Sequence, residues 1–336
     1  MRSTLALISV FMLIAVAPRI GEAQSSRYQG KTLTIVVGYK PGGGYDATAR
    51  LLARHLPKHI LGKPTVIVQN MPGANSLIAA NHVYAVAKPD GLTIGTFNRN
   101  LPIAQLIKVD GVKFDMTKFA WVGSAASEST VLAIRADLPY QSFDELRKAG
   151  KTVVIGATGP GANTYDFPLL LKELLGVDLK IVSGYSSSAD IMLAIERKEA
   201  DGRAGSYSSL RPFIDRNLVR PVIRARAVEA GIEQLPVDED LAPTPRAKAI
   251  MALRSAPEII GRPYVMPPGT PDDAVKMMRE AFRKAIKDPE LVAEAKKAKM
   301  ELEFIAGDEA LKVVKELLAQ PKDVVDEFSK YIKFGE

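Results

Sequence analysis

The chain of 336 residues contains no cysteine, one tryptophan and three histidines. Without cysteine it can form no disulfide, no thiol nucleophile and no cysteine–zinc site. This composition is compatible with an oxidising compartment, in which a free thiol is a liability.

Long hydrophobic runs are also scarce, and the one that stands out lies at the amino terminus, from Leu5 to Ala17. It is too short for a spanning helix, which needs about 20 apolar residues. Arg2 precedes the run, and the small residues Gly21 and Ala23 follow it. This order is typical of a secretory signal. The sequence therefore predicts export, with residues 1–23 as a signal peptide cleaved near Ala23.

Blocks of basic residues are missing too, and aromatic residues make up only 7% of the chain. A nucleic-acid surface usually combines clustered Lys and Arg with aromatic side chains, so we expect no nucleic-acid partner. The formal charge of +7 is spread along the chain. A mildly basic exported protein suits a small acidic molecule better.

Several catalytic motifs are absent or incomplete. Two glycine-rich turns, at 38–44 and 156–161, have the glycine spacing of a P-loop but lack the lysine and hydroxyl residue that should follow. No G-x-S-x-G elbow is present. His55 and His59 have the spacing of zinc ligands on a helix, but the glutamate of H-E-x-x-H is missing and Pro57 lies between them. We interpret them as surface histidines and expect no metal, no cofactor and no enzyme, although chemistry by carboxylates alone stays open.

Strand and helix patterns alternate along the chain. Strands are predicted at 32–37, 64–70, 92–97, 152–156 and 179–183, and helices at 46–60, 75–87, 164–175 and 188–197. After Pro271 the pattern is helical, with apolar residues at 275, 278, 282 and 286, and two more helices follow at 308–319 and 322–332. This alternation predicts an α/β fold with mostly parallel sheets flanked by helices.

One part of the sequence echoes another at a distance of 120 residues. The segments 31–46 and 151–166 share Lys, Thr, Ile, Tyr and Asp at equivalent positions, the last pair being Asp46 and Asp166. Each segment reads as a strand, a glycine-rich turn and a helix. A helix N-terminus offers free N–H groups and the positive end of the helix dipole to an anion. Two such ends could hold one ligand between them.

The motifs in these segments resemble a known family. "GYKPGGGYD" (38–46), "VQNMPGAN" (68–75), "PDGLTI" (89–94), the segment 184–202 and "RPYVMPPGTPDDAV" (262–275) are similar, in order, to motifs of the substrate-binding receptors of tripartite tricarboxylate transporters, the Bug family. The resemblance covers nearly all of the chain after the signal peptide.

The resemblance implies a two-lobed periplasmic binding protein of type II, the Venus-flytrap kind. Lobe one would comprise residues 27–130 and 262–336, and lobe two residues 131–261, with a hinge near 129–135 and 262–266. Its partners would be a small organic acid and the membrane permease of the transporter, and we expect a monomer without a cofactor. A periplasmic ligand sensor for a membrane signalling protein is the alternative, and a secreted carboxylate-acting enzyme is a third.

The resemblance also implies ligand-binding residues on two loops and their neighbours. The first loop comprises Tyr39, Lys40, Pro41, Gly42, Gly43, Gly44, Tyr45 and Asp46. The second contributes Ala157, Thr158, Gly159, Gly161, Asn163 and Thr164, and the neighbouring turns contribute Asn75, Tyr185, Ser186 and Ser188. Lys40, Asn75 and Ser187 stand where the family usually has small residues or glycine, so the ligand cannot be inferred from any relative.

Four charged residues carry open alternatives. Asp46 and Asp166 lie at helix starts, where we favour capping of free N–H groups over ligand contact. Arg203 follows a predicted strand and could clamp a carboxylate with two parallel bonds, or it could be a plain surface arginine. Lys40 could pair with a ligand carboxylate or lie exposed on the rim.

Overall fold

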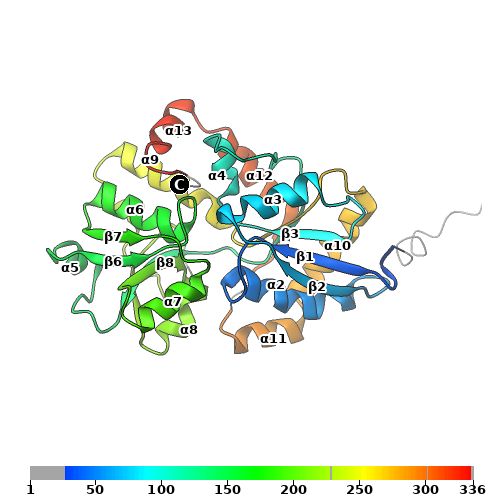
Figure 1. The fold of residues 1–336 in the computed structure, drawn as a ribbon, viewed down its shortest axis with the longest axis horizontal. Coiled ribbons are helices and arrows are strands. Elements are labelled where there is room, and N and C mark those ends of the chain that lie inside the picture. Colours follow the sequence, from blue (N-terminus) through cyan, green and yellow to red (C-terminus); the bar gives the residue numbers. More distant parts are fainter. Residues whose placement is uncertain (1–26, 228, 301, 334–336) are drawn as a thin grey trace, which may run out of the picture.

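The computed structural model describes residues 27–227, 229–300 and 302–333. These residues form two α/β lobes side by side, each built on its own sheet (Figure 1). The predicted signal peptide and its cleavage site lie outside the described residues. Within the described ranges, no helix is both long and apolar enough to cross a bilayer.

The first lobe contains a six-stranded sheet in the order β11-β4-β10-β3-β1-β2. Its strands are β1 (Thr32–Val37), β2 (Thr65–Asn70), β3 (Thr93–Thr96), β4 (Ala120–Ser124), β10 (Pro263–Met266) and β11 (Ile305–Ala306). Side chains of β1 alternate between the two faces of the sheet, as the strand geometry requires. Val36 enters one core, and Leu33, Ile35 and Val37 enter the other.

Helices cover both faces of this sheet, so the lobe has three layers (Figure 1). One face carries α3 (Leu77–Ala85), α4 (Leu101–Leu106), α12 (Gly307–Leu318) and α13 (Lys322–Phe328), and the other carries α2 (Gly44–His55), α10 (Asp272–Ile286) and α11 (Pro289–Lys297). The apolar stripe predicted after Pro271 is confirmed, because Val275, Met278, Phe282 and Ile286 are all buried.

The second lobe contains a five-stranded sheet in the order β7-β6-β8-β5-β9. Its strands are β5 (Thr130–Arg135), β6 (Val153–Gly156), β7 (Leu179–Val182), β8 (Gly202–Ser206) and β9 (Val219–Arg224). One face packs against α5 (Phe143–Arg147) and α6 (Asn163–Leu175), and the other against α7 (Ser188–Glu196) and α8 (Tyr207–Ile214). Helix α9 (Pro245–Ser255) joins the two cores, since Met251 packs in the second lobe and Ile250 in the first.

The two sheets repeat one design. Strands β2-β1-β3-β10-β4 match β7-β6-β8-β5-β9 position by position. The first three strands of each set are parallel, as the alternating pattern predicts, but β10 and β5 are antiparallel to their neighbours. Each sheet is therefore mixed, although most of its strands, four of six in the first lobe and four of five in the second, run in one direction as predicted. β5 and β10 run against their neighbours because each is the first strand after the chain has crossed from the other lobe.

The two crossings lie side by side. Residues 125–129 lead from β4 to β5, and the short helix Ala256–Ile259 with residues 260–262 leads back to β10. Backbone hydrogen bonds join them, from Ala125 N to Arg262 O (3.1 Å) and from Glu128 N to Glu258 O (3.0 Å). The predicted lobe limits lie next to these crossings. The predicted hinge segments 129–135 and 262–266 overlap the crossings only at residues 129 and 262 and otherwise form β5 and β10, and bending there stays a prediction.

Candidate ligand site between the lobes

A cavity lies between the two lobes and is lined by residues of both. Its volume is about 90 Å³, which corresponds to roughly three water molecules at about 30 Å³ each. The lining residues are Tyr39, Gly43, Gly44, Tyr45, Asn98, Arg99, Glu128, Thr158, Ala162, Asn163, Thr164, Ser187, Ser188, Arg203, Gly205, Ser206, Ser209 and Arg262. We refer to it as the main cavity.

Two helix N-termini point into the main cavity. Helix α2 begins at Gly44 after Gly43, and α6 begins at Asn163 after Ala162; all four residues line the cavity. Neither N-cap residue makes a side-chain capping hydrogen bond. The first N–H groups and the positive dipole ends of both helices are thus directed at the same space, an arrangement that stabilises an anion.

Asp46 and Asp166 brace the glycine-rich loops. Asp46 accepts hydrogen bonds from Gly42 N (3.0 Å) and Arg50 Nε (2.9 Å), and Asp166 accepts one from Gly161 N (2.9 Å). Both carboxylates are buried and neither lines the main cavity. The 120-residue echo therefore corresponds to a repeated contact, in which an aspartate in the first turn of a helix fixes the loop before it.

The two aspartates differ in their ionisation. Burial works against the charge of Asp46, but hydrogen bonds from Arg50, Gly42 and Asn70 hold the pKa of its carboxyl below the usual value. Burial raises the pKa of Asp166 to about 8, opposed by the hydrogen bond from Gly161 N and by the charge of Arg254. Asp166 is therefore largely protonated at neutral pH.

Tyr39 and Tyr45 form one wall of the main cavity. Their rings stack with centroids 5.3 Å apart, and the Tyr45 hydroxyl accepts a hydrogen bond from Arg99 N (3.0 Å). Burial raises the pKa of both phenols, that of Tyr45 to about 12. Both hydroxyls are therefore neutral at physiological pH, and that of Tyr45 donates to Gly261 O (3.4 Å).

A buried group of three charges lies where the cavity meets the crossings. Glu128, on the first crossing, forms ion pairs with Arg99 and Arg262, and all three side chains are at most 5% exposed. Arg99 also donates to Thr130 Oγ1 (2.9 Å), and Arg262 donates to Ser208 Oγ (3.2 Å) in the second lobe. Burial opposes ionisation of Glu128, but Arg262 and Arg99 hold the pKa of its carboxyl below the usual value.

Arg203 is a further buried cation, on β8. Its side chain is surrounded by neutral groups: Nε lies 3.1 Å from Met192 Sδ, Nη1 donates to Ala204 O (3.2 Å), and Nη2 donates to Ser209 Oγ (3.3 Å). Among the described residues no carboxylate lies within ion-pair distance of it. Burial lowers the pKa of Arg203 to about 10, so the guanidinium stays charged at neutral pH.

The cavity rim holds the lobes together. Lys40 Nζ donates to Ser186 Oγ (2.9 Å), Asn98 Nδ2 donates to Gly161 O (2.9 Å), and Asn75 Nδ2 donates to Pro160 O. Asn75 has a φ of 48°, and φ is also positive at its neighbours Ala74 and Ser76. The helix predicted from residue 75 therefore begins only at Leu77. This left-handed turn directs the Asn75 amide across the cleft.

The predicted site residues fall into three groups. Nine line the main cavity: Tyr39, Gly43, Gly44, Tyr45, Thr158, Asn163, Thr164, Ser188 and Arg203. Lys40, Asn75, Tyr185 and Ser186 line a second opening at the rim. Pro41, Gly42, Asp46, Ala157, Gly159 and Gly161 support the loops without lining either of these spaces.

The sequence-based prediction missed the charges Arg99, Glu128 and Arg262, and the polar residues Asn98, Ser206 and Ser209. One signal was available, since "NRN" (98–100) follows β3 at the same sheet edge from which the first glycine-rich loop leaves β1. Glu128 and Arg262 carried no such signal, because crossing segments have no periodicity.

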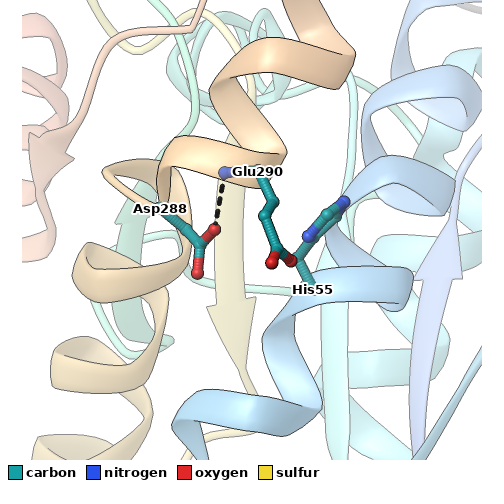
Figure 2. Close-up of side chains that lie close together, drawn as sticks. All are labelled: His55, Asp288 and Glu290. Carbon is teal, nitrogen blue, oxygen red and sulfur yellow. Dashed lines mark hydrogen bonds between the residues drawn. The ribbon is translucent and has the colours of Figure 1, made fainter.

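A separate group of titratable side chains joins α2 to α11 on the first lobe. Figure 2 shows His55, Asp288 and Glu290 close together, with Asp288 accepting a hydrogen bond from Glu290 N (2.9 Å). Lys58 Nζ occupies the space between the carboxylates, 2.8 Å from Asp288 Oδ2 and 2.7 Å from Glu290 Oε2. We interpret the group as an ion-pair network that holds α11 against α2.

The two histidines belong to this network and are less exposed than we expected. His55 Nε2 lies 2.8 Å from Glu294 Oε2, and His59 Nε2 lies 2.8 Å from Asp288 Oδ2. His55 is only 9% exposed. Sequence reasoning missed these partners because α11 follows α2 by more than 200 residues.

Comparison with known proteins places the chain in a family. The family described as "Tripartite tricarboxylate transporter family receptor" matches residues 48–329. A protein of Cupriavidus necator, "UPF0065 protein in gbd 5'region", is 24% identical over 324 residues, which cover 93% of this chain and 92% of that protein.

Solved structures show the same fold. The periplasmic binding protein BugD superposes with a TM-score of 0.75 at 21% identity, covering 91% of this chain and 100% of that one. MatC from Rhodopseudomonas palustris, solved with bound malate, gives a TM-score of 0.70 at 22% identity, covering 88% and 99%. The chain has two matching sheets with a cavity between them, and the family match covers most of its length. It therefore belongs to the receptor family of tripartite tricarboxylate transporters, whose members are periplasmic solute-binding proteins.

Proposed function

We propose that this protein captures a small organic anion, a carboxylate, between its lobes in the periplasm and delivers it to a tripartite tricarboxylate transporter permease. The charge of the main cavity is the observation that carries the proposal. Its charged lining residues are Arg99, Arg203 and Arg262 against the single carboxylate of Glu128. Because the two helix N-termini add to this excess, the space favours a negatively charged occupant.

The polar residues of the second loop suit carboxylate oxygens. Thr158 and Thr164 share a hydrogen bond between their hydroxyls (2.8 Å), and both line the main cavity. Hydroxyl and amide groups can donate to a carboxylate. The malate-bound relative of the same fold supports this ligand class.

The mechanism follows from where these groups lie. Lobe one, residues 27–130 and 262–336, contributes Gly43, Gly44 and the tyrosines, and lobe two, residues 131–261, contributes Thr158, Asn163 and Thr164. A ligand bound by both sets makes more contacts when the lobes are closed, and this difference in affinity stabilises the closed state. Bending at the paired crossings would let the ligand enter and leave.

A thermal-shift experiment tests the ligand class. The mature protein is unfolded and refolded to remove any copurified ligand, and a panel of organic acids is then added at increasing concentration. An acid at 100 times its dissociation constant adds about 2.7 kcal/mol to the unfolding free energy, which raises Tm by roughly 5 °C or more. A shift with neutral or cationic compounds and with no acid would refute the proposal.

The variant Gly43→Leu gives a matched structural test. Gly43 has an ordinary extended backbone (φ −85°), so a side chain there causes no backbone strain. Its Cβ would lie 3.2 Å from Ser188 Oγ across the cleft, and the rest of a leucine side chain has to enter the cavity. We expect the variant to fold with an unchanged Tm but to lose the ligand-induced shift.

Delivery to a permease needs a cellular experiment. Cells from which the gene has been deleted should lose uptake of the acid identified by thermal shift, and uptake should return with the wild-type gene but not with Gly43→Leu. Normal uptake in the deletion strain, together with a lost transcriptional response to the acid, would favour the sensor alternative.

A further inference from the structure

A second cavity adjoins the main one and has a different lining. It has a volume of about 290 Å³ and shares six residues with the main cavity: Gly43, Gly44, Ser188, Arg203, Ser209 and Arg262. Its other walls are mostly apolar: Ala47, Ala189, Met192, Pro212, Phe213, Ala298 and Met300, with Gly42 and Ser208. We refer to it as the side cavity.

Both lobes build the side cavity. Ala47 on α2 and Met300 after α11 belong to the first lobe, whereas Ala189 on α7 and Phe213 on α8 belong to the second. Next to the wall residues Phe213 and Ala298, the side chains of Lys299 and Asp215 form an ion pair of 2.5 Å between the lobes. The side cavity is therefore a space that exists only while the lobes are closed, as the main cavity is.

Arg203 separates the two cavities and lines both. The structure makes room for its guanidinium at Gly205, where an added Cβ would overlap Arg203 Nη1. Ser209, which also lines both cavities, accepts from Nη2. The arginine is thus held at the boundary by its surroundings, with its Nε 3.1 Å from Met192 Sδ.

The position of Arg203 is energetically costly without a ligand. Its side chain is 2% exposed and its hydrogen-bond acceptors are neutral. A buried charge without an opposite charge destabilises a fold unless something compensates for it. In contrast, Arg99 and Arg262 share Glu128, so their charges are partly balanced inside the protein. Arg203 is the cation of this cavity that an incoming carboxylate would neutralise.

We propose that the two cavities form one site, in which Arg203 binds a ligand carboxylate and the side cavity holds an apolar group of the same ligand. The inference rests on the proposed function and narrows it. The ligand is an organic acid that carries an aromatic ring or a bulky alkyl group, rather than a compact acid that fits the main cavity alone.

The apolar compartment is tested with a pair of acids that differ only by a ring, succinate and 2-phenylsuccinate. Isothermal titration calorimetry on the refolded protein should show 2-phenylsuccinate binding about 10-fold tighter or more, because burial of even one or two methylene-sized groups gives discrimination of that order. Filling the side cavity with Ala189→Leu should lower the affinity for 2-phenylsuccinate more than that for succinate and so remove this preference. Ala85→Leu, an equal change on α3 outside both cavities, should alter neither affinity.

The charge is tested with Arg203→Met, which retains the length of the side chain and removes the guanidinium. We expect at least a 100-fold loss of affinity for both acids. We also expect the Tm of the ligand-free variant to rise by a few degrees, because an unbalanced buried charge is gone. Removal of an exposed arginine of the same lobe, Arg197→Met, should change neither quantity.

The outcomes separate this inference from the proposed function. If no acid of the panel binds the wild-type protein, the proposed function fails and the inference falls with it. If acids bind but 2-phenylsuccinate has no advantage, or Ala189→Leu leaves its advantage intact, the inference alone fails. If Arg203→Met keeps its affinity for acids, or lowers the Tm of the ligand-free protein, Arg203 is a structural residue and the inference is likewise wrong.

Discussion

Replacement of Glu128 by glutamine tests whether the buried charges hold the lobe junction together. Glu128 is 3% exposed and pairs with both Arg99 and Arg262, which are 5% and 4% exposed in their side chains. Glutamine keeps the size of the side chain but leaves two buried guanidinium groups without an opposite charge. Removing one partner of a buried ion pair typically costs about 3–5 kcal/mol, so we expect a loss of unfolding free energy in this range.

The single tryptophan provides the assay. Trp121 lies on β4, close to the first crossing, is 1% exposed, and donates from Nε1 to Met116 O (2.8 Å). Its fluorescence during urea denaturation therefore reports the unfolding of the first lobe at the junction. Glu280→Gln serves as the control, because Glu280 pairs with Arg283 on an exposed face. An exposed pair of this kind contributes little to stability because solvent screens it, so we expect the control to leave the denaturation midpoint nearly unchanged.

A double variant shows whether the loss comes from unbalanced charge. In Arg99→Met combined with Glu128→Gln, only Arg262 remains of the buried group. If charge balance is the cause, the double variant loses less stability than the sum of the two single variants, with a coupling of about 1 kcal/mol or more. A loss below about 1 kcal/mol for Glu128→Gln, or strictly additive losses, would refute the reasoning.

Three further outcomes follow from the structure. Burial raises the pKa of Asp166 to about 8, so the native state keeps a proton that the unfolded chain releases near pH 4. The free energy of unfolding should therefore fall as pH rises from 4 to 8. Asp166→Asn should flatten this dependence in thermal melts between pH 5 and pH 8. Gly261→Ala should prevent folding or lower Tm by more than 10 °C, because the φ of Gly261 is 47° and an added Cβ would overlap Ala126 O. A near-normal Tm would contradict the contact between the two crossings. Lys299→Ala removes the exposed ion pair with Asp215, so we expect Tm to change by about 2 °C or less. Ligand release, measured by stopped flow, should become a few-fold faster. Unchanged release would show that this contact does not hold the closed state.

Local patterns predicted those parts of the fold that local physics determines. The strand β1 alternates between two cores, and α10 buries an apolar stripe, so both could be read from periodicity. The antiparallel direction of β5 and β10 could not, because it depends on which lobe the chain has just left. The segment around Asn75 shows another limit. Its sequence predicts a helix, but Ala74, Asn75 and Ser76 adopt a left-handed turn that places the Asn75 amide against the opposite lobe.

The candidate site divides along the same line. The glycine-rich loops were predicted because strand, turn and helix are neighbours in sequence, and the aspartates that brace them lie within five residues of their backbone partners. The charges that set the character of the cavity come from segments more than 100 residues apart, such as Glu128 and Arg262. Arg203 illustrates the consequence most clearly. In the sequence it fits a ligand clamp and a surface arginine equally well, and only the packing of β8 beneath α7 and α8 makes it a buried cation between two cavities. The fold thus builds the strand, turn and helix of the proposed anion site twice, whereas the discrimination among anions that we propose rests on side chains that have no counterpart in the repeat.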